Sequence, residues 1–225
     1  MRPLPPLSLI ETRVLGVLFE KQHTVPDTYP LTLNALVSGC NQKTSRAPVL
    51  EATDADVQAA LDSLKAMSLA IDSSGGRVTR YEHNIERVLR IPEQSAALLA
   101  TLMLRGPQTA GELRIASERL HRFADISAVE AFLTELARRE GTPLVAELPR
   151  LPGARENRWS HLLSGAPLIN EPADVRPDGE VAPRDIDALR ARMAALETEV
   201  DALKTLLGQV CSELGIARRD GPGGV

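Results

Sequence analysis

Apolar residues recur at intervals of three and four in two stretches of the chain that lie 72 positions apart. The stripes are Val57, Leu61 and Leu64 in the first stretch and Val129, Leu133 and Leu136 in the second. Residues at this spacing share one face of a helix, so each stretch is predicted to be an amphipathic helix with a buried side. Similar spacing around residues 10–18 and 98–103 predicts an earlier helix in each half.

Residues that can cap a helix precede four predicted helices. A Ser or Thr followed three residues later by an acidic residue forms a capping box, in which each side chain bonds the other's backbone. The four pairs are Ser8 with Glu11, Thr53 with Asp56, Thr109 with Glu112, and Ser127 with Glu130. A further short helix carries Leu33, Leu36 and Val37 on its buried face. The sequence does not decide where this helix starts. Pro30 suits a first helical turn, and Thr32 is an alternative cap.

Each half ends in two short extended runs around a turn, which predicts a β-hairpin. The first hairpin is Leu69–Ile71 with 77–83, and the second is Leu144–Leu148 with 155–161. Both returning strands read Arg-x-x-Arg-aromatic-x-His. The shared plan predicts a mainly α protein with small β-hairpins (α+β). We expect a helix-turn-helix followed by a wing in each half, so that residues 1–91 and 92–163 form tandem winged-helix domains.

The last 60 residues follow a different pattern. Residues 164–184 contain four prolines among Gly and acidic residues, which predicts a flexible linker. Residues 185–216 then show apolar steps of three and four, which predict a coiled-coil helix and a homodimer. The seam residues are Ile186, Leu189, Met193, Leu196, Val200, Leu203, Leu207, Val210 and Leu214. Flanking charges of opposite sign favour a parallel pair.

Composition narrows the function classes. Two cysteines, Cys40 and Cys211, lie far apart without metal-ligand spacing, which favours free thiols in a reducing compartment. No apolar run reaches membrane-spanning length and no signal core follows Met1, so we expect a cytoplasmic protein without membrane contact. Residues 1–91 carry ten basic and ten acidic side chains, and residues 92–165 carry nine of each. Any nucleic-acid binding must therefore come from a local patch.

The long turn after the second helix is one candidate for such a patch. It runs Asn41-Gln-Lys-Thr-Ser-Arg46 and holds amides, hydroxyls and two cations without a carboxylate. These groups can bond bases or phosphates. They can also satisfy the backbone of an irregular connection. For Asn41 and Gln42 we favour the second role, in which they satisfy the backbone of the turn. For Lys43 and Arg46 the sequence favours neither ligand binding nor this structural role.

The wings are the other candidate. Alternation along a strand places Arg80 opposite Tyr81, and Arg158 opposite Trp159, with the aromatic side chains packed inward. The outward cations are then Arg77, Arg80, Arg155 and Arg158. Arginine suits phosphate and the minor groove, although a solvated hairpin with cross-strand ion pairs is an equal alternative. The helices at 54–67 and 127–139 expose carboxylates, which phosphates repel, so their insertion into a DNA groove is disfavoured.

Catalysis finds little support in the sequence. The four histidines have no metal-ligand spacing, and neither a phosphate-binding Gly loop nor a nucleophile elbow is present. A thiolate at Cys40 could be stabilised at a helix end, but a small buried core residue is the favoured interpretation. We therefore expect no enzyme activity, no metal and no cofactor.

Several short motifs resemble one bacterial family. They are Glu11-x-Arg13-Val-Leu-Gly16, Glu20-Lys-Gln22, Tyr29-Pro-Leu31, Cys40-Asn-Gln-Lys43, Arg46-x-Pro-Val49 and Leu104-Arg-Gly106. Over residues 7–165 the chain resembles the YceH-like proteins, an uncharacterised family. The resemblance implies two winged-helix domains and a C-terminal coil, and it carries no activity or ligand onto these residues.

Two functions follow as hypotheses. The leading one is a non-enzymatic, regulatory homodimer that binds double-stranded DNA with low sequence preference. The alternative is a protein-protein interaction scaffold that uses the same domains without nucleic acid. The cationic turn and wings favour the first, and the neutral halves with acidic third helices favour the second.

Overall fold

The computed structural model describes residues 4–73, 78–139, 141–150, 153–166 and 200. Two compact units divide the chain, at 1–172 and 173–225. The described part of the first unit is mixed α+β, with seven α-helices and two small antiparallel sheets. The linker and coiled-coil predictions fall outside the described residues, except at residues 164–166 and 200. Of the seam residues only Val200 is described, and it is helical and exposed.

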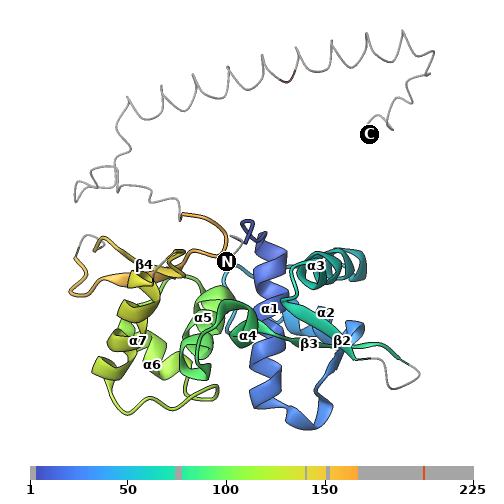
Figure 1. Cartoon of the computed structure of the whole chain (residues 1–225), viewed down its shortest axis with the longest axis horizontal. Helices are drawn as coiled ribbons and strands as arrows, with labels where there is room; N and C mark the ends of the chain where they lie inside the picture. The colour runs from blue at the N-terminus through green and yellow to red at the C-terminus, as the bar shows by residue number, and fades with distance from the viewer. Residues whose placement is uncertain (1–3, 74–77, 140, 151–152, 167–199, 201–225) are drawn as a thin grey trace, which may run out of the picture. The chain divides into compact units, whose positions relative to one another are not determined.

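The first half begins with a long helix and ends with a hairpin (Figure 1). Its elements are α1 (Leu9–Thr24), the 3-10 turn η1 (Pro26–Thr28), β1 (Leu31–Thr32), α2 (Leu33–Cys40), α3 (Asp54–Ala66), β2 (Ala70–Ser73) and β3 (Arg80–His83). The strand order is β1-β3-β2, with Leu31 opposite Tyr81 and Asp72 on the other side of Tyr81. The hairpin was predicted, whereas the third strand at the sheet edge was not.

The second half repeats this order after a short connecting helix, α4 (Ile85–Leu89). Its elements are α5 (Glu93–Arg105), α6 (Ala110–Ala116), α7 (Ile126–Arg138), β4 (Val145–Leu148) and β5 (Arg158–His161). A single bridge pairs Gln108 with Trp159, at the place where Leu31 pairs with Tyr81 in the first half. The two halves therefore share their pairing pattern as well as their element order.

Helix starts follow the predicted caps with one exception. Capping boxes form at Ser8, Thr53 and Thr109, and Thr32 caps α2. The prediction of a box at Ser127 is wrong, because α7 begins at Ile126 and the Asp125 side chain accepts from the Ala128 N–H at 2.8 Å. Asp is as good a cap as Ser, and because Asp125 lies two residues before Ser127, α7 starts two residues earlier than predicted.

One continuous core joins the halves. Both predicted stripes are buried, and α1 packs against α5 in the largest interface between any two elements (Figure 1). Gly16 permits this approach, since a Cβ there would lie 3.0 Å from the Leu104 side chain. Gly39 does the same for α2, since its Cβ would lie 2.6 Å from Val17 Cγ1. The predicted boundary near residue 91 thus falls inside a shared core.

Candidate functional site

The turn between α2 and α3 is held from within by Asn41. Its Oδ1 accepts from the Ala52 N–H at 2.7 Å, and its Nδ2 donates to the Ala52 carbonyl at 2.8 Å. The Asn41 side chain thus bonds both backbone groups of Ala52, as a paired residue of a neighbouring strand would, and this closes the turn. The structural interpretation of Asn41 is therefore the one that its contacts support.

Arg46 is buried, which supports the structural one of the two roles left open for it and argues against its place among nucleic-acid-binding residues. Its guanidinium forms a two-point ion pair with Glu20 of α1, at 2.8 and 2.9 Å, and its Nε donates to the Gly39 carbonyl at 3.1 Å. Gln42 accepts a further bond at 2.8 Å. Because the Arg46 side chain has no exposed surface, its charge serves to fasten the turn onto α1.

Arg13 is a second buried cation beside this pair. It is 0% exposed, and it donates to the carbonyls of Cys40 (3.0 Å) and Pro48 (2.6 Å), while its Nε has no partner among the described residues. Burial, together with the charge of Arg46, lowers the pKa of the Arg13 guanidinium. Arg13 therefore anchors the two ends of the turn to α1 and is not free to meet a ligand.

Glu20 is the carboxylate that balances this cationic core. Burial alone would raise its pKa, but the hydrogen bonds and charge of Arg46, with those of Lys21, hold the pKa below its usual range. Lys21 Nζ lies 3.1 Å from the same carboxylate. Glu20 is thus ionised and fully engaged.

Lys43 stays exposed at the outer edge of the turn, as predicted. The turn itself docks on the end of α5: the Ala47 N–H donates to the Leu104 carbonyl at 2.8 Å, and Arg105 Nη2 donates to Ser45 Oγ at 2.7 Å. The turn and the α5–α6 connection therefore form one surface, which brings an arginine of the second half beside the motif of the first.

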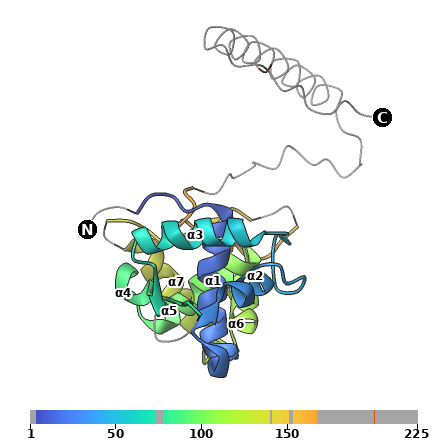
Figure 2. The same cartoon turned by 90° about the vertical axis from the view of Figure 1, so that its right-hand side faces the viewer.

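A cavity of about 260 Å³ opens at this junction, between α1, the turn, α5 and α6. Lys21, Arg105 and Arg119 line it, together with four hydroxyl side chains, those of Thr24, Thr44, Ser45 and Thr101. We call it the basic pocket. Its one carboxylate, Glu20, is already paired with Arg46 and Lys21. Figure 2 shows α2 beside α1, and the turn that contributes Thr44 and Ser45 to the pocket directly follows α2.

Sequence patterns alone pointed to neither Arg105 nor Arg119 as a binding residue. Arg105 lies in the Leu104-Arg-Gly106 motif, which was noted only for its resemblance. Arg119 follows α6 and carries no motif. Both arginines are exposed, and their place beside the turn depends on the packing of the second half on the first.

The first wing matches its predicted orientation. Tyr81 is buried and Arg80 is exposed, and Arg80 Nη1 donates to the carbonyls of Thr28 (3.2 Å) and Pro30 (2.8 Å). Part of its hydrogen-bonding capacity is therefore used within the fold. Arg77 lies outside the described residues.

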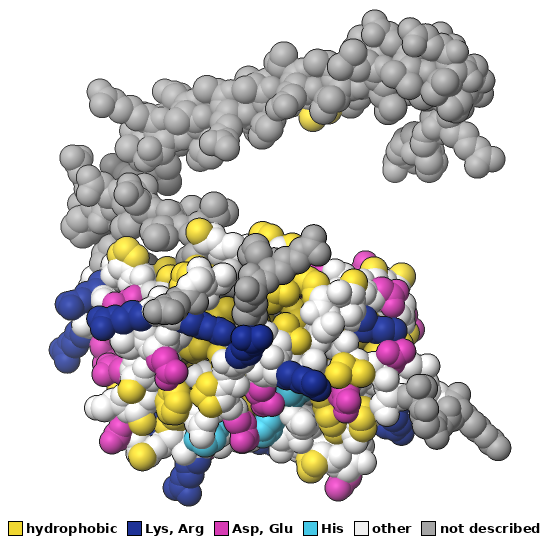
Figure 3. Space-filling view, viewed as in Figure 1, with side chains coloured by type: hydrophobic (Ala, Val, Ile, Leu, Met, Phe, Trp, Pro, Cys, Tyr) yellow, Lys and Arg dark blue, Asp and Glu magenta, His cyan; other side chains and the backbone are white. Residues whose placement is uncertain are grey.

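The second wing matches its predicted orientation in part. Trp159 packs against the hydrophobic core as predicted, although it is only half-buried. Arg158 is half-buried and does not face fully outward, and Ser160 is the buried residue of β5. Trp159 lines a groove of about 520 Å³ between α7 and the hairpin, where Arg138, Arg150 and Arg155 alternate with Glu130, Glu147 and Glu156. Figure 3 shows these two charge types side by side over this face. Arg155 is exposed as predicted, but its surroundings are electrically balanced.

The third helices expose carboxylates, as their sequence indicates. On α3, Asp54, Asp56 and Asp62 are exposed, and Lys65 is half-buried in an ion pair with Asp72 at 3.1 Å. On α7 the exposed charges are Glu130, Glu135 and Arg138. The outward face of α3 is therefore acidic.

His83, His161 and Cys40 are buried titratable groups that do not line the basic pocket. Burial lowers the pKa of His83 to about 4, with the nearby charge of His23 as a smaller cause, and burial alone does the same for His161. Burial raises the pKa of Cys40 to about 12, so its thiolate is disfavoured and its predicted place in the core is confirmed. Within the described ranges, no cluster of three or more His, Cys, Asp or Glu side chains is placed to hold a metal.

Fold and surface together define a class: a mixed α+β protein of two like-ordered halves with a cationic pocket at their junction. No helix in the described part is long and apolar enough to cross a membrane. Residues 7–154 match the family described as "Protein of unknown function, DUF480", and the chain belongs to that family.

Several similar proteins carry the name UPF0502 protein. The one from Dechloromonas aromatica is 62% identical over 203 residues, which cover 90% of this chain and 95% of the relative. The one from Burkholderia multivorans is 59% identical over 224 residues, covering 99% and 94%. The one from Cupriavidus necator is 57% identical over 217 residues, covering 95% and 89%.

Proposed function

We propose that the protein is a non-enzymatic, cytoplasmic regulator that binds double-stranded DNA with low sequence preference. In this proposal residues 1–91 and 92–163 are tandem winged-helix domains, 164–184 a linker, and 185–216 a coiled coil that forms a homodimer. The element order helix–strand–helix–helix–hairpin supports the winged-helix assignment in the first half. The Gln108 bridge to Trp159 supports it in the second. The likeness to the YceH-like proteins points the same way.

The observation that carries the proposal is the basic pocket and its rim. Three cations line one concave surface, and the single carboxylate is paired with Arg46 and Lys21. Lys43 is exposed in the turn, between the lining residues Gln42 and Thr44. Lys and Arg with Ser and Thr hydroxyls are the side chains that bind phosphate oxygens. A surface of this kind attracts the backbone of a duplex although each half of the chain is neutral overall.

Low sequence preference is expected because the side chains available for DNA contact are ones that bind phosphates. Phosphate contacts position a protein on DNA without reading bases. The acidic face of α3 is repelled by phosphates and is a poor candidate for the major groove. The exposed wing arginines, Arg80 and Arg155, then act as outer contacts of the same electrostatic kind.

Salt titrations of duplex binding, followed by fluorescence anisotropy, test the proposal. Lys43→Gln with Arg119→Gln should weaken binding to all duplexes alike and reduce the log–log salt slope by roughly 1.8, at about 0.9 per phosphate contact. Arg87→Gln with Arg90→Gln is the matched control, because it removes two exposed charges from α4 and its end. Equal losses in both variants, or no binding to random duplex at moderate salt, would refute DNA contact through this pocket.

The acidic face of α3 favours a second candidate, a protein-interaction scaffold. Asp54→Asn with Asp62→Asn removes two charges and spares Asp56, whose carboxylate caps α3 through Thr53. The scaffold function predicts that this variant loses a partner protein in a pull-down performed with nuclease. DNA binding predicts unchanged or tighter duplex affinity.

A further inference from the structure

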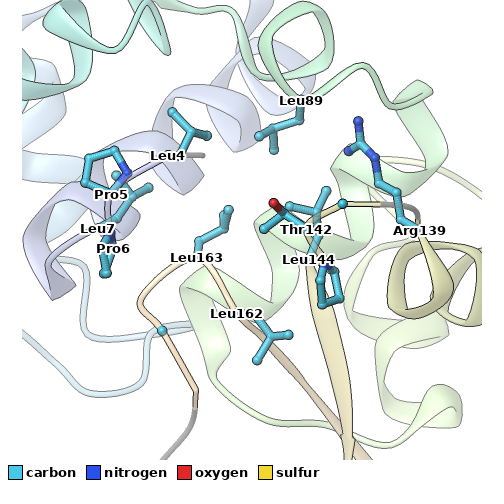
Figure 4. Close-up of a pocket in the computed structure, with 13 residues that line it drawn as sticks. Leu4, Pro5, Pro6, Leu7, Leu89, Arg139, Thr142, Leu144, Leu162 and Leu163 are labelled. Atoms are coloured by element: carbon cyan, nitrogen blue, oxygen red, sulfur yellow. The ribbon is translucent and has the colours of Figure 1, made fainter. Parts of the chain in front are cut away.

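A second cavity, of about 530 Å³, lies at the other side of the first unit (Figure 4). Four separate segments meet there: the N-terminal residues before α1, the end of α4, the connection from α7 to β4, and the chain after β5. Its walls are mainly leucine, contributed by Leu4, Leu7, Leu89, Leu144, Leu162 and Leu163. We call it the leucine pocket.

Backbone hydrogen bonds fix the walls of the leucine pocket. The Leu7 N–H donates to the Leu163 carbonyl at 2.8 Å, and the Leu162 N–H donates to the Leu144 carbonyl at 2.8 Å. Leu7, Leu89, Leu144 and Leu163 are also members of the hydrophobic core. The cavity is therefore part of the packed fold, and a ligand would enter a largely formed site.

Polar side chains are few in this lining. Arg139 is the one ionisable side chain of the lining, and Thr142 supplies a hydroxyl. Figure 4 shows the Thr142 side chain directed toward the leucines and Arg139 at the edge near Leu89. Apolar walls with one or two convergent polar groups are typical of sites for small molecules, and this volume lies within their usual range of roughly 300–1,000 Å³.

We propose that the leucine pocket binds an apolar carboxylate of the fatty-acid class. The hydrocarbon part covers the leucines, where water makes few hydrogen bonds. The carboxylate meets Arg139, whose planar guanidinium matches a carboxylate with two parallel bonds. Charge complementarity selects this class, because neither an alkylamine nor an alcohol supplies the anion that one cation calls for. The site is independent of the basic pocket and of DNA.

Calorimetric titration of the full chain with decanoate, below its micelle concentration, tests the proposal, with decanol and decylamine as matched probes. We expect decanoate to bind at least roughly tenfold more tightly than decylamine, since the ion pair is lost and replaced by repulsion. Arg139→Gln should lower decanoate affinity to that of decanol. Arg138→Gln, the neighbouring arginine that lines the groove beside Trp159, should leave it unchanged.

A blocking variant separates pocket binding from non-specific adsorption. Thr142 is exposed at the rim, so Thr142→Trp should fill the entrance, abolish decanoate binding and leave the melting temperature close to that of the wild type. Decanoate binding that survives Thr142→Trp would overturn the site. Equal affinity for decylamine would overturn the ligand class. Absence of decanoate binding to the full chain would overturn both.

Discussion

Replacement of Glu20 by glutamine is expected to destabilise the protein more than removal of any exposed charge. The carboxylate bonds both terminal nitrogens of Arg46, at 2.8 and 2.9 Å, and the Arg46 side chain is fully buried. A glutamine fills the same volume but leaves the guanidinium without a counter-charge. Arg13 lies nearby with a charge of the same sign, which adds to the repulsion.

The expected loss is about 3 kcal/mol of unfolding free energy. Breaking one side of a buried ion pair removes roughly 3–5 kcal/mol, because an uncompensated charge is left inside. The lower end applies, since 16% of the Glu20 side chain is exposed and water can reach the vacated position. By contrast, Asp72→Asn breaks a pair whose side chains are 33% and 45% exposed, and because water screens such a pair it should change stability far less than Glu20→Gln.

Urea unfolding followed by circular dichroism measures both variants. A third variant, Glu20→Leu with Arg46→Met, should recover much of the loss, because an apolar pair can replace a buried ion pair of similar volume. The difference between wild type and Glu20→Gln should shrink in acid: the folded pKa of Glu20 is depressed, so its contribution is lost as pH falls through that pKa. If Glu20→Gln costs no more than Asp72→Asn, the structural account of the turn is wrong.

Three further outcomes are expected. Because burial lowers the pKa of His83 and His161 to about 4, the unfolded state takes up protons first as pH falls below about 6.5. Stability should then decline between pH 6.5 and 4, by up to about 3 kcal/mol per imidazole. His161→Gln should flatten urea midpoints measured across that range. A chain of residues 1–91 should lack a cooperative urea transition, because α1 loses α5, whereas residues 1–166 should melt cooperatively; a cooperative melt of the shorter chain would contradict this. In light scattering the full chain should be a dimer and residues 1–166 a monomer, and a monomeric full chain at micromolar concentration would exclude the coiled coil.

Local patterns predicted the local structure well. The stripes at Val57 and Val129 are buried, three capping boxes form, and both hairpins lie where the turn signals place them. Such features depend on residues three to seven positions apart, and periodicity reports them directly. The prediction of the α7 cap was wrong for a local reason too. Asp125 and Ser127 can both cap this helix, and the sequence does not show which of them does.

Partners distant in sequence could not be predicted. Glu20 and Arg46 are 26 positions apart, and Arg13 reaches Pro48 across 35. A run of polar residues after a helix is equally compatible with a loop that binds a ligand and with a turn whose side chains form hydrogen bonds within the same chain. Only the approach of α1 to the turn decides, and that approach depends on small residues at Gly16 and Gly39.

The basic pocket shows why the residues first suspected are not those best placed to act. In the turn from Asn41 to Arg46, the two most distinctive side chains are consumed by the fold: one closes the turn and the other fastens it to α1. A side chain whose bonds are all satisfied inside the protein has little left for a ligand. Binding falls instead to the cations that the fold leaves at the surface, Lys43 and Arg119, with Arg105 shared between both roles through Ser45. Because two of these three belong to the second half, phosphate binding here requires the halves to be docked. Disruption of the α1–α5 interface should therefore abolish duplex binding without any change to a cationic residue.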